Sequence, residues 1–204
     1  EILSSARFVG LDRPETVSAL ARVMTGATQR KPLQSMLNAD CIFLLGSNIT
    51  DENPVSGYLL RAAMKDAKKQ LIIASSRPCG LDPLAGATLR LLPGDEAGLL
   101  SNLIRQDTQV SDSVLAAFTD QVRGILAEAQ DITLLIGTEF LRSSKAEACL
   151  RWIEQTVDHF SAECKSVGLQ FLFDRPNQLG LWDMGCLSGV GPGWQPIETP
   201  SPDA

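Results

Sequence analysis

The sequence predicts an α/β fold, a doubly wound and mainly parallel sheet of the Rossmann-like kind, made of two related βαβ halves. Short apolar runs of strand length alternate along the chain with amphipathic helical segments. The order strand, glycine turn, helix, strand, Arg-Pro occurs twice, at residues 40–78 and again at 131–176. Strands that follow one another through helices form right-handed crossovers, so a parallel sheet with helices on both faces is expected.

Residues 1–38 are predicted to form an N-terminal helix and a linker that come from a preceding domain. Pro14 suits the first turn of a helix, and Gly26 suits the position just after its last turn. A polar stretch then leads into the first strongly apolar run.

Residues 39–176 are predicted to form an α/β nucleotide-binding-like domain, with one half at 39–110 and the other at 111–176. The run at 41–45 has five consecutive apolar residues between Asp40 and a Gly-Ser-Asn turn, which indicates a strand buried on both faces. The expected elements of the first half are strands at 41–45, 71–74 and 89–92, with helices that begin at Pro54 and at Asp95.

The second half begins with a long amphipathic helix, in which apolar residues recur at helical spacing. A strand at 132–136 ends in a Gly-Thr turn, and a second amphipathic helix then precedes a strand at 169–173. The tail, residues 177–204, is rich in glycine and proline and has no periodicity. We therefore expect irregular chain that packs on the rest of the protein.

Composition narrows the class of protein further. The 204 residues are 44% hydrophobic and 21% charged, as in a globular protein, and the net charge is −6. No apolar run is long enough to span a bilayer, so we expect no direct membrane insertion. The acidic balance argues against a nucleic acid partner, because phosphates are neutralised by Lys and Arg. The first residues lack a signal-peptide pattern, which predicts a cytoplasmic protein.

The five cysteines are widely spaced and never form a C-x-x-C pair. This spacing is typical of reduced, structural thiols. It does not supply the clustered thiolates of an iron–sulfur centre or of a four-ligand zinc site, so no metal ligand is expected. The cysteines are Cys41, Cys79, Cys149, Cys164 and Cys186.

Two polar turns follow strands of the predicted sheet: Gly46-Ser47-Asn48 in the first half and Gly137-Thr138 in the second. Ligands of doubly wound sheets bind beyond the carboxyl ends of the strands, and glycine lets the backbone approach a phosphate closely. Neither turn carries a dinucleotide-binding or P-loop motif. The two turns therefore have two open interpretations: a nucleotide site, or glycines that only allow the strand-to-helix turns.

The residues that follow the second strand of each βαβ unit also bear on whether a nucleotide binds. In dinucleotide-binding units an acid usually holds the ribose at this place. Ser75 or Ser76 stands there in the first half, and Asp174 stands there in the second. A serine can bind a hydroxyl group, but without charge assistance the hydrogen bond is weaker.

Charged residues near these strand ends favour structural roles over catalysis. Arg77 and Arg175 have the charge to meet a pyrophosphate, but a surface ion pair with Asp82 or Asp174 is the favoured interpretation. His159 is the only histidine and lies off the apolar stripe of its helix, so we expect a solvated imidazole. No catalytic residue is assigned, because no nucleophile and base can be paired around it.

Residues 39–55, which read ADCIFLLGSNITDENPV, resemble the molybdopterin oxidoreductase superfamily. In that family an Ala-Asp pair, an apolar strand, Gly-Ser-Asn, a polar loop and a Pro-Val helix start recur together. Residues 91–100, LLPGDEAGLL, are similar to its Pro-Gly-Thr-Asp segment. The late Asn, Gly, Asp-Met-Gly, Pro-Gly series of the family is matched by Asn177, Gly180, Asp183, Met184, Gly185, Pro192 and Gly193.

The resemblance implies a set of cofactor-binding positions. In members that carry a cofactor, the Gly-Ser-Asn loop and the end of the next strand hold the nucleotide part of a molybdopterin guanine dinucleotide. The implied positions are Gly46, Ser47, Asn48 and Thr50 for the phosphates, Ser75 and Arg77 for the guanosine end, and Pro93, Gly94 and Asp95 for the rim.

The sequence departs from the family where the cofactor is recognised. The family's Asp-Pro-Arg is replaced by Ser75-Ser76-Arg77, which removes the acid that would bind the guanosine. No candidate molybdenum ligand stands in a recognisable context, and the iron–sulfur cysteines of full-length members are absent. These departures favour the branch of the large iron–sulfur subunit of NADH–quinone oxidoreductase (the G-type or 75 kDa-type subunit), which keeps the fold without molybdenum.

The resemblance thus leads us to expect a fragment of such a subunit that acts as a structural, cofactor-free scaffold and is inactive alone. Its partners would be other domains of the same subunit and neighbouring subunits, which would place it peripherally on the cytoplasmic side of the inner membrane. Iron–sulfur clusters are expected only on N-terminal domains that this sequence lacks.

Two alternatives remain open. In the first, the chain is part of the pterin guanine dinucleotide site of a formate dehydrogenase-like catalytic subunit. In the second, it is a middle domain of the kind found in thiamine diphosphate enzymes. The second rests on the strand-Gly-helix pattern at residues 125–152. It ranks lower, because thiamine-binding motifs are absent and Asp183-Met184-Gly185 has no explanation there.

Overall fold

The fold is described from a computed structural model. It describes residues 13–26, 34, 37–105, 113–163, 165–173, 177–187, 189–195 and 197. Asp174 and Arg175, which follow the last predicted strand, and Cys164 lie outside these residues. Among the described helices, none has the length and hydrophobicity needed to cross a bilayer.

Five parallel strands form the single sheet that the structure describes, in the order β3-β2-β1-β4-β5. Central strand β1 pairs with β2 on one side and β4 on the other, so that Phe43 stands opposite Ile72 and Leu134. This order confirms the predicted doubly wound α/β fold, with a βαβ unit on each side of the line between β1 and β4. The strands are β1 (Cys41–Leu45), β2 (Gln70–Ser75), β3 (Ala87–Arg90), β4 (Asp131–Gly137) and β5 (Ser166–Leu172).

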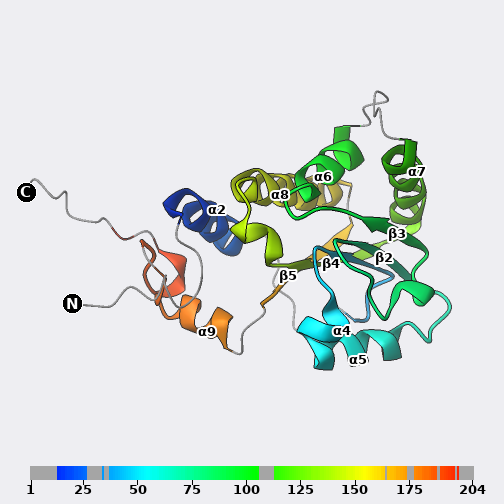
Figure 1. The fold of residues 1–204 in the computed structure, drawn as a ribbon, viewed down its shortest axis with the longest axis horizontal. Helices are drawn as coiled ribbons and strands as arrows, with labels where there is room; N and C mark the ends of the chain where they lie inside the picture. Colours follow the sequence, from blue (N-terminus) through cyan, green and yellow to red (C-terminus); the bar gives the residue numbers. More distant parts are fainter. Residues whose placement is uncertain are drawn as a thin grey trace, which may run out of the picture.

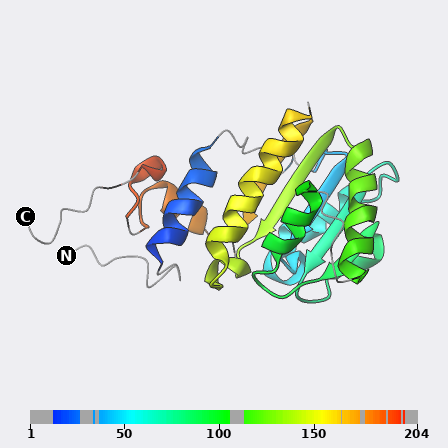
Figure 2. The same cartoon turned by 90° about the horizontal axis from the view of Figure 1, so that it is seen from above.

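Helices cover both faces of the sheet (Figures 1 and 2). One face carries α4 (Ile49–Glu52) and α5 (Pro54–Ala63), which connect β1 to β2. The opposite face carries α6 (Glu96–Arg105), α7 (Ser113–Glu128) and α8 (Ala146–Ala162), and α2 (Pro14–Thr25) packs outside α8. Short 3-10 turns, η1 (Asp82–Leu84) and η2 (Glu139–Arg142), follow β2 and β4.

The apolar run of β1 explains this layered arrangement. All five residues are buried, and successive side chains point to opposite faces of the strand. Cys41, Phe43 and Leu45 join the core beneath the larger helical layer, whereas Ile42 and Leu44 join the core beneath α5. Each fully buried Leu, Ile or Phe favours the folded state by about 1.5–3 kcal/mol, so this strand anchors both cores.

The edge strand β3 differs from its predicted position. The sequence indicated residues 89–92, but the strand spans Ala87–Arg90, where Ala87 pairs with Ile72. Leu92 is 73% exposed and contributes nothing to the sheet. Edge strands with one covered face alternate in burial, so an apolar run is a poor guide to their ends.

The tail forms a small aromatic cluster, although irregular chain was expected there. It contains helix α9 (Gln178–Asp183) and the turn η3 (Pro192–Trp194), which packs against α2. Trp182 is fully buried and meets Phe173 and Trp194 edge to face, at ring-centroid distances of 5.0 and 5.9 Å. The indole N–H of Trp194 donates a hydrogen bond to Asp183 Oδ1, 2.6 Å away. These contacts give the Gly- and Pro-rich segment a packing role.

Candidate functional site

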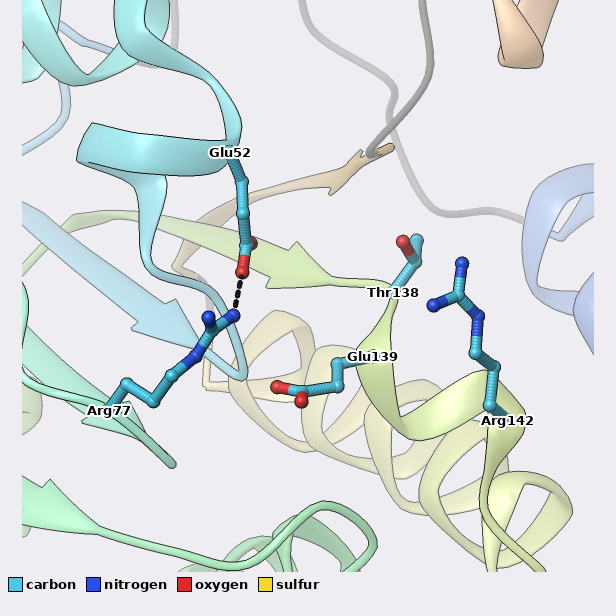
Figure 3. A pocket seen from close by; sticks show the side chains of 5 residues that line it. All are labelled: Glu52, Arg77, Thr138, Glu139 and Arg142. Atoms are coloured by element: carbon cyan, nitrogen blue, oxygen red, sulfur yellow. Dashed lines mark hydrogen bonds and ion pairs between the residues drawn. The ribbon is translucent and has the colours of Figure 1, made fainter.

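A crevice lies at the carboxyl ends of the central strands, where connections from β1 and β4 leave toward opposite faces of the sheet. This is the place where doubly wound sheets bind their ligands. The crevice has a volume of about 210 Å³ (Figure 3). Its lining residues are Glu52, Arg77, Thr138, Glu139 and Arg142. Arg77 was a predicted binding residue, and Thr138 belongs to the second polar turn of the sequence analysis; the other three were not predicted to bind.

The two turn glycines meet at the base of this region. Gly46 has a φ of +67°, which favours glycine over any residue with a Cβ. A Cβ atom on Gly137 would lie 1.9 Å from the carbonyl oxygen of Gly46 and 2.8 Å from the Cβ of Ser47. The backbone approach of the two turns therefore accounts for both glycines without a ligand.

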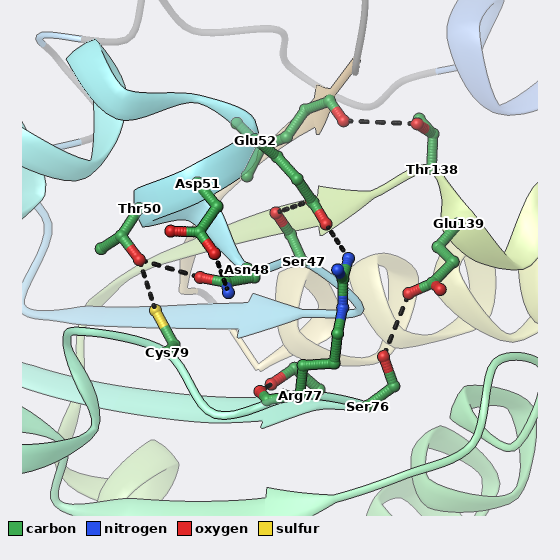
Figure 4. A network of polar contacts seen from close by, with 12 residues as sticks. Ser47, Asn48, Thr50, Asp51, Glu52, Ser76, Arg77, Cys79, Thr138 and Glu139 are labelled. Carbon is green, nitrogen blue, oxygen red and sulfur yellow. Dashed lines mark hydrogen bonds and ion pairs between the residues drawn. The ribbon is translucent and has the colours of Figure 1, made fainter.

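The carboxylate of Glu52 joins two of the predicted binding residues. Ser47 Oγ donates a hydrogen bond to Glu52 Oε2 at 2.7 Å, and Arg77 Nη2 donates to Glu52 Oε1 at 2.8 Å (Figure 4). Ser47 is buried, whereas the Arg77 side chain is 57% exposed. A residue assigned to the phosphates and one assigned to the guanosine end thus share one internal anion. The ion-pair interpretation of Arg77 gains support, but its partner is Glu52 instead of Asp82.

The remaining polar groups of the first turn also bind within the protein. Asn48 Nδ2 donates to Asp51 Oδ2 at 2.8 Å and to the Pro78 carbonyl at 3.2 Å. Thr50 Oγ1 donates to Asn48 Oδ1 at 2.8 Å and lies 3.9 Å from Cys79 Sγ. These contacts tie the turn after β1 to the turn after β2 (Figure 4).

Ser75 is buried and faces its own turn. Its hydroxyl donates to the carbonyl of Arg77 at 2.8 Å and accepts a hydrogen bond from Arg90 Nη1 at 3.2 Å. Arg90 also pairs with Asp82, the acid that was an expected partner of Arg77. Ser75 therefore fixes the end of β2 and does not line the crevice.

A buried acid that was not among the predicted site residues follows the predicted rim, Pro93-Gly94-Asp95. Glu96 is 3% exposed, its Oε2 accepts a hydrogen bond from the Gly94 N–H at 2.5 Å, and its Oε1 lies 3.2 Å from the Cβ position of Gly46. Burial raises the pKa of this carboxyl group. Asp95 points to Lys145, with Oδ1 and Nζ 2.7 Å apart.

Cys149 lies against the same carboxyl group, with Sγ 3.9 Å from Glu96 Oε2. Burial, together with the negative charge of Glu96, raises the pKa of this thiol to about 12. A thiol with such a pKa is protonated at neutral pH and is not a nucleophile. It packs as a small apolar residue beside the turn.

The described residues place neither a histidine nor a metal-binding group at the crevice. His159 lies on α8 with Nε2 3.6 Å from Glu163 Oε1, and it lines a different small cavity near Lys165, at the amino end of β5. Within the part of the chain that the structure describes, no three His, Cys, Asp or Glu side chains are grouped so as to hold a metal ion. The crevice offers two carboxylates and two guanidinium groups, an arrangement suited to internal ion pairing.

In this arrangement the residues do not fit the phosphates of a molybdopterin guanine dinucleotide. Ser47 and Arg77 already donate to Glu52, and the Asn48 amide donates to Asp51 and Pro78. A phosphate in the crevice would also lie close to the carboxylates of Glu52 and Glu139, whose negative charges oppose its binding.

Comparison with known proteins adds sequence and fold relatives. No protein-family model matches the chain. A G-type subunit of NADH-quinone oxidoreductase from Rhizobium meliloti (strain 1021) is 35% identical over 195 residues, which cover 87% of this chain and 23% of that protein. The chain therefore spans about a quarter of the length of this relative.

Solved structures match the chain at low sequence identity. A chain of the formyltransferase/hydrolase complex (FhcABCD) from Methylorubrum extorquens, in complex with methylofuran, matches with a TM-score of 0.53 and 16% identity, over 97% of this chain and 59% of that one. Acetylene hydratase from Pelobacter acetylenicus matches with a TM-score of 0.49 and 16% identity, over 68% and 23%. The sequence match confirms the predicted resemblance: the chain is a relative of a segment of the G-type subunit of NADH-quinone oxidoreductase.

Proposed function

We propose that the chain is a segment of an oxidoreductase subunit of the NADH–quinone oxidoreductase type, in which this α/β body serves as a structural scaffold and binds no molybdopterin nucleotide. The 35% identity to the G-type subunit of such a complex supports an oxidoreductase subunit. We expect the isolated chain to be catalytically inactive. The described residues that line the crevice include no nucleophile paired with a base, and no metal site is found among the described residues.

One observation carries the cofactor-free part of the proposal: the carboxylate of Glu52 accepts hydrogen bonds from both Ser47 and Arg77. Charge-assisted hydrogen bonds of this kind are stronger than neutral ones, and a phosphate would have to displace them. The buried carboxyl group of Glu96 beside Gly46 adds a second acid near the same turn.

The proposed partners follow from the similarity to the G-type subunit. Other domains of the subunit and neighbouring subunits would surround this body, carry the iron–sulfur clusters, and hold it peripherally on the cytoplasmic side of the inner membrane. Two apolar side chains one helical turn apart on α5, Val55 and Tyr58, are each 72% exposed. Their exposure supports contact between α5 and the surface of another protein.

The test is a search for the cofactor in the purified protein. Acid release followed by mass spectrometry is expected to find no stoichiometric pterin guanine dinucleotide, while a sample spiked with the dinucleotide controls for its recovery. A stoichiometric amount would overturn the cofactor-free role and favour the formate dehydrogenase-like alternative instead.

A further inference from the structure

We propose that Glu52 is a built-in anion that occupies a site for phosphate-class anions, and that removing its charge turns the crevice into a binding site for inorganic pyrophosphate. The inference rests on the proposed function, because Glu52 cannot exclude anions from the crevice if the natural protein binds a nucleotide there. It goes further by assigning the exclusion of anions to a single side chain.

The local chain path explains how the carboxylate comes to lie there. Gly46 turns the chain sharply after β1, and α4 follows at once, with the Glu52 N–H donating to the Asn48 carbonyl at 2.9 Å. This one turn of helix brings Glu52 back over Ser47, five residues earlier, where the two side chains meet at 2.7 Å. The Glu52 side chain is 23% exposed and lines the crevice.

The two donors that hold Glu52 are those that an oxyanion ligand needs. The hydroxyl of Ser47 comes from the end of β1, and the guanidinium of Arg77 comes from the end of β2 (Figure 4). Carboxylate and phosphate oxygens accept hydrogen bonds in the same way, and arginine binds both. An anion that replaced the Glu52 carboxylate would therefore find both donors in place.

Charge in the crevice decides whether such an anion can enter. The lining residues carry two carboxylates, Glu52 and Glu139, and two guanidinium groups, Arg77 and Arg142, and these charges cancel. Glu139 is held on the far side by a hydrogen bond from Ser76 Oγ at 3.1 Å. Loss of the Glu52 charge leaves a net positive lining, which attracts an anion.

The experiment measures pyrophosphate binding by isothermal titration calorimetry on the full chain. Glu52→Ala is expected to bind pyrophosphate at least about ten-fold more tightly than the wild type. Glu147→Ala is the matched control, because it removes one exposed carboxylate of α8, where Glu147 pairs with Arg151 away from the crevice. The control should bind pyrophosphate no better than the wild type.

A double variant tests whether the anion binds where the geometry places it. Adding Arg77→Ala to Glu52→Ala should abolish the gain. A gain that survives this second change, or a Glu52→Ala affinity equal to that of Glu147→Ala, would overturn the inference.

Glu52→Gln covers the case in which the alanine variant does not fold, as judged by circular dichroism. The amide oxygen can still accept from Ser47 while the charge is gone, so a smaller gain of the same sign is expected. No gain in this folded variant also overturns the inference. Absence of a gain together with a cofactor-free wild type refutes this inference alone, whereas a stoichiometric pterin nucleotide in the wild type refutes the proposed function as well.

Discussion

The backbones of Gly46 and Gly137 approach so closely that a Cβ atom on Gly137 would lie 1.9 Å from the carbonyl oxygen of Gly46. This contact joins the turns after β1 and β4, which are neighbouring strands of the sheet. Because the neighbour is backbone, no side-chain rotation can relieve the overlap. The close approach therefore constrains the two turns that lead to the crevice residues Glu52 and Thr138.

Gly137→Ala is expected to lower the free energy of unfolding by about 3 kcal/mol, the upper part of the range for overpacking, because both strand ends must move apart. Gly124→Ala is the matched control, since Gly124 lies inside α7 with open space around its Cβ position. That variant should gain up to about 1 kcal/mol from helix propensity. Urea unfolding followed by circular dichroism measures both, and equal effects would contradict the role of the glycine contact.

The buried carboxyl group of Glu96 predicts a pH dependence of stability. Burial raises its pKa above the ordinary value of 4.5, so the folded chain holds this proton more tightly than the unfolded chain. The stabilisation from this proton is complete below pH 4.5 and is lost as the pH rises through the folded-state pKa. Glu96→Gln keeps an oxygen to accept the Gly94 hydrogen bond and does not titrate.

The free energy of unfolding of Glu96→Gln minus that of the wild type is therefore expected to grow as the pH rises above 4.5 and to level off once the pH has passed the folded-state pKa of Glu96. Urea unfolding at a series of pH values measures the difference. Glu147→Gln, on the exposed surface of α8, is the control for the exchange of a carboxylate for an amide. A Glu96→Gln difference that changes with pH no more than that of the control would contradict the raised pKa of the Glu96 carboxyl group.

The sheet was predictable because its central strands are marked by sequence on both sides. Residues 41–45 are apolar without interruption between Asp40 and Gly46, and burial on both faces demands this pattern. The edge strand β3 was misplaced by two residues because only one of its faces is covered. The aromatic cluster of the tail was missed because Trp182 and Trp194 carry no periodic signal and meet only in the folded chain.

The candidate site was predicted only in part for a similar reason. The positions of Ser47 and Arg77 at the strand ends follow from the topology, but their shared partner Glu52 depends on how α4 folds back. The sequence held one signal, an acid five residues after the serine of the Gly-Ser-Asn turn. The prediction named Asp95 and not its neighbour Glu96, the buried acid. Burial of an acid at the start of a helix depends on tertiary packing and not on local sequence.

Cysteine reactivity provides a further prediction. Burial raises the pKa of the Cys41 thiol to about 12, and Cys149 has a similarly raised pKa, whereas Cys186 is exposed. Iodoacetamide at about pH 8 should therefore label Cys186 in the native protein and leave Cys41 and Cys149 unlabelled until urea is added, because only the thiolate reacts. Peptide mass spectrometry reads out each site. Rapid labelling of Cys149 in the native protein would contradict its burial against Glu96.

The packing of the tail can be tested through two neighbouring residues of α9. Trp182 is fully buried between Phe173 and Trp194, so Trp182→Ala should lower the free energy of unfolding by about 3–5 kcal/mol. Leu181, the adjacent residue, is 45% exposed, and Leu181→Ala should change it by less than about 0.5 kcal/mol. Urea unfolding compares the two. A large difference ties α9 to the cooperative core through one face of the helix, while similar small effects would mean that the tail unfolds apart from the sheet.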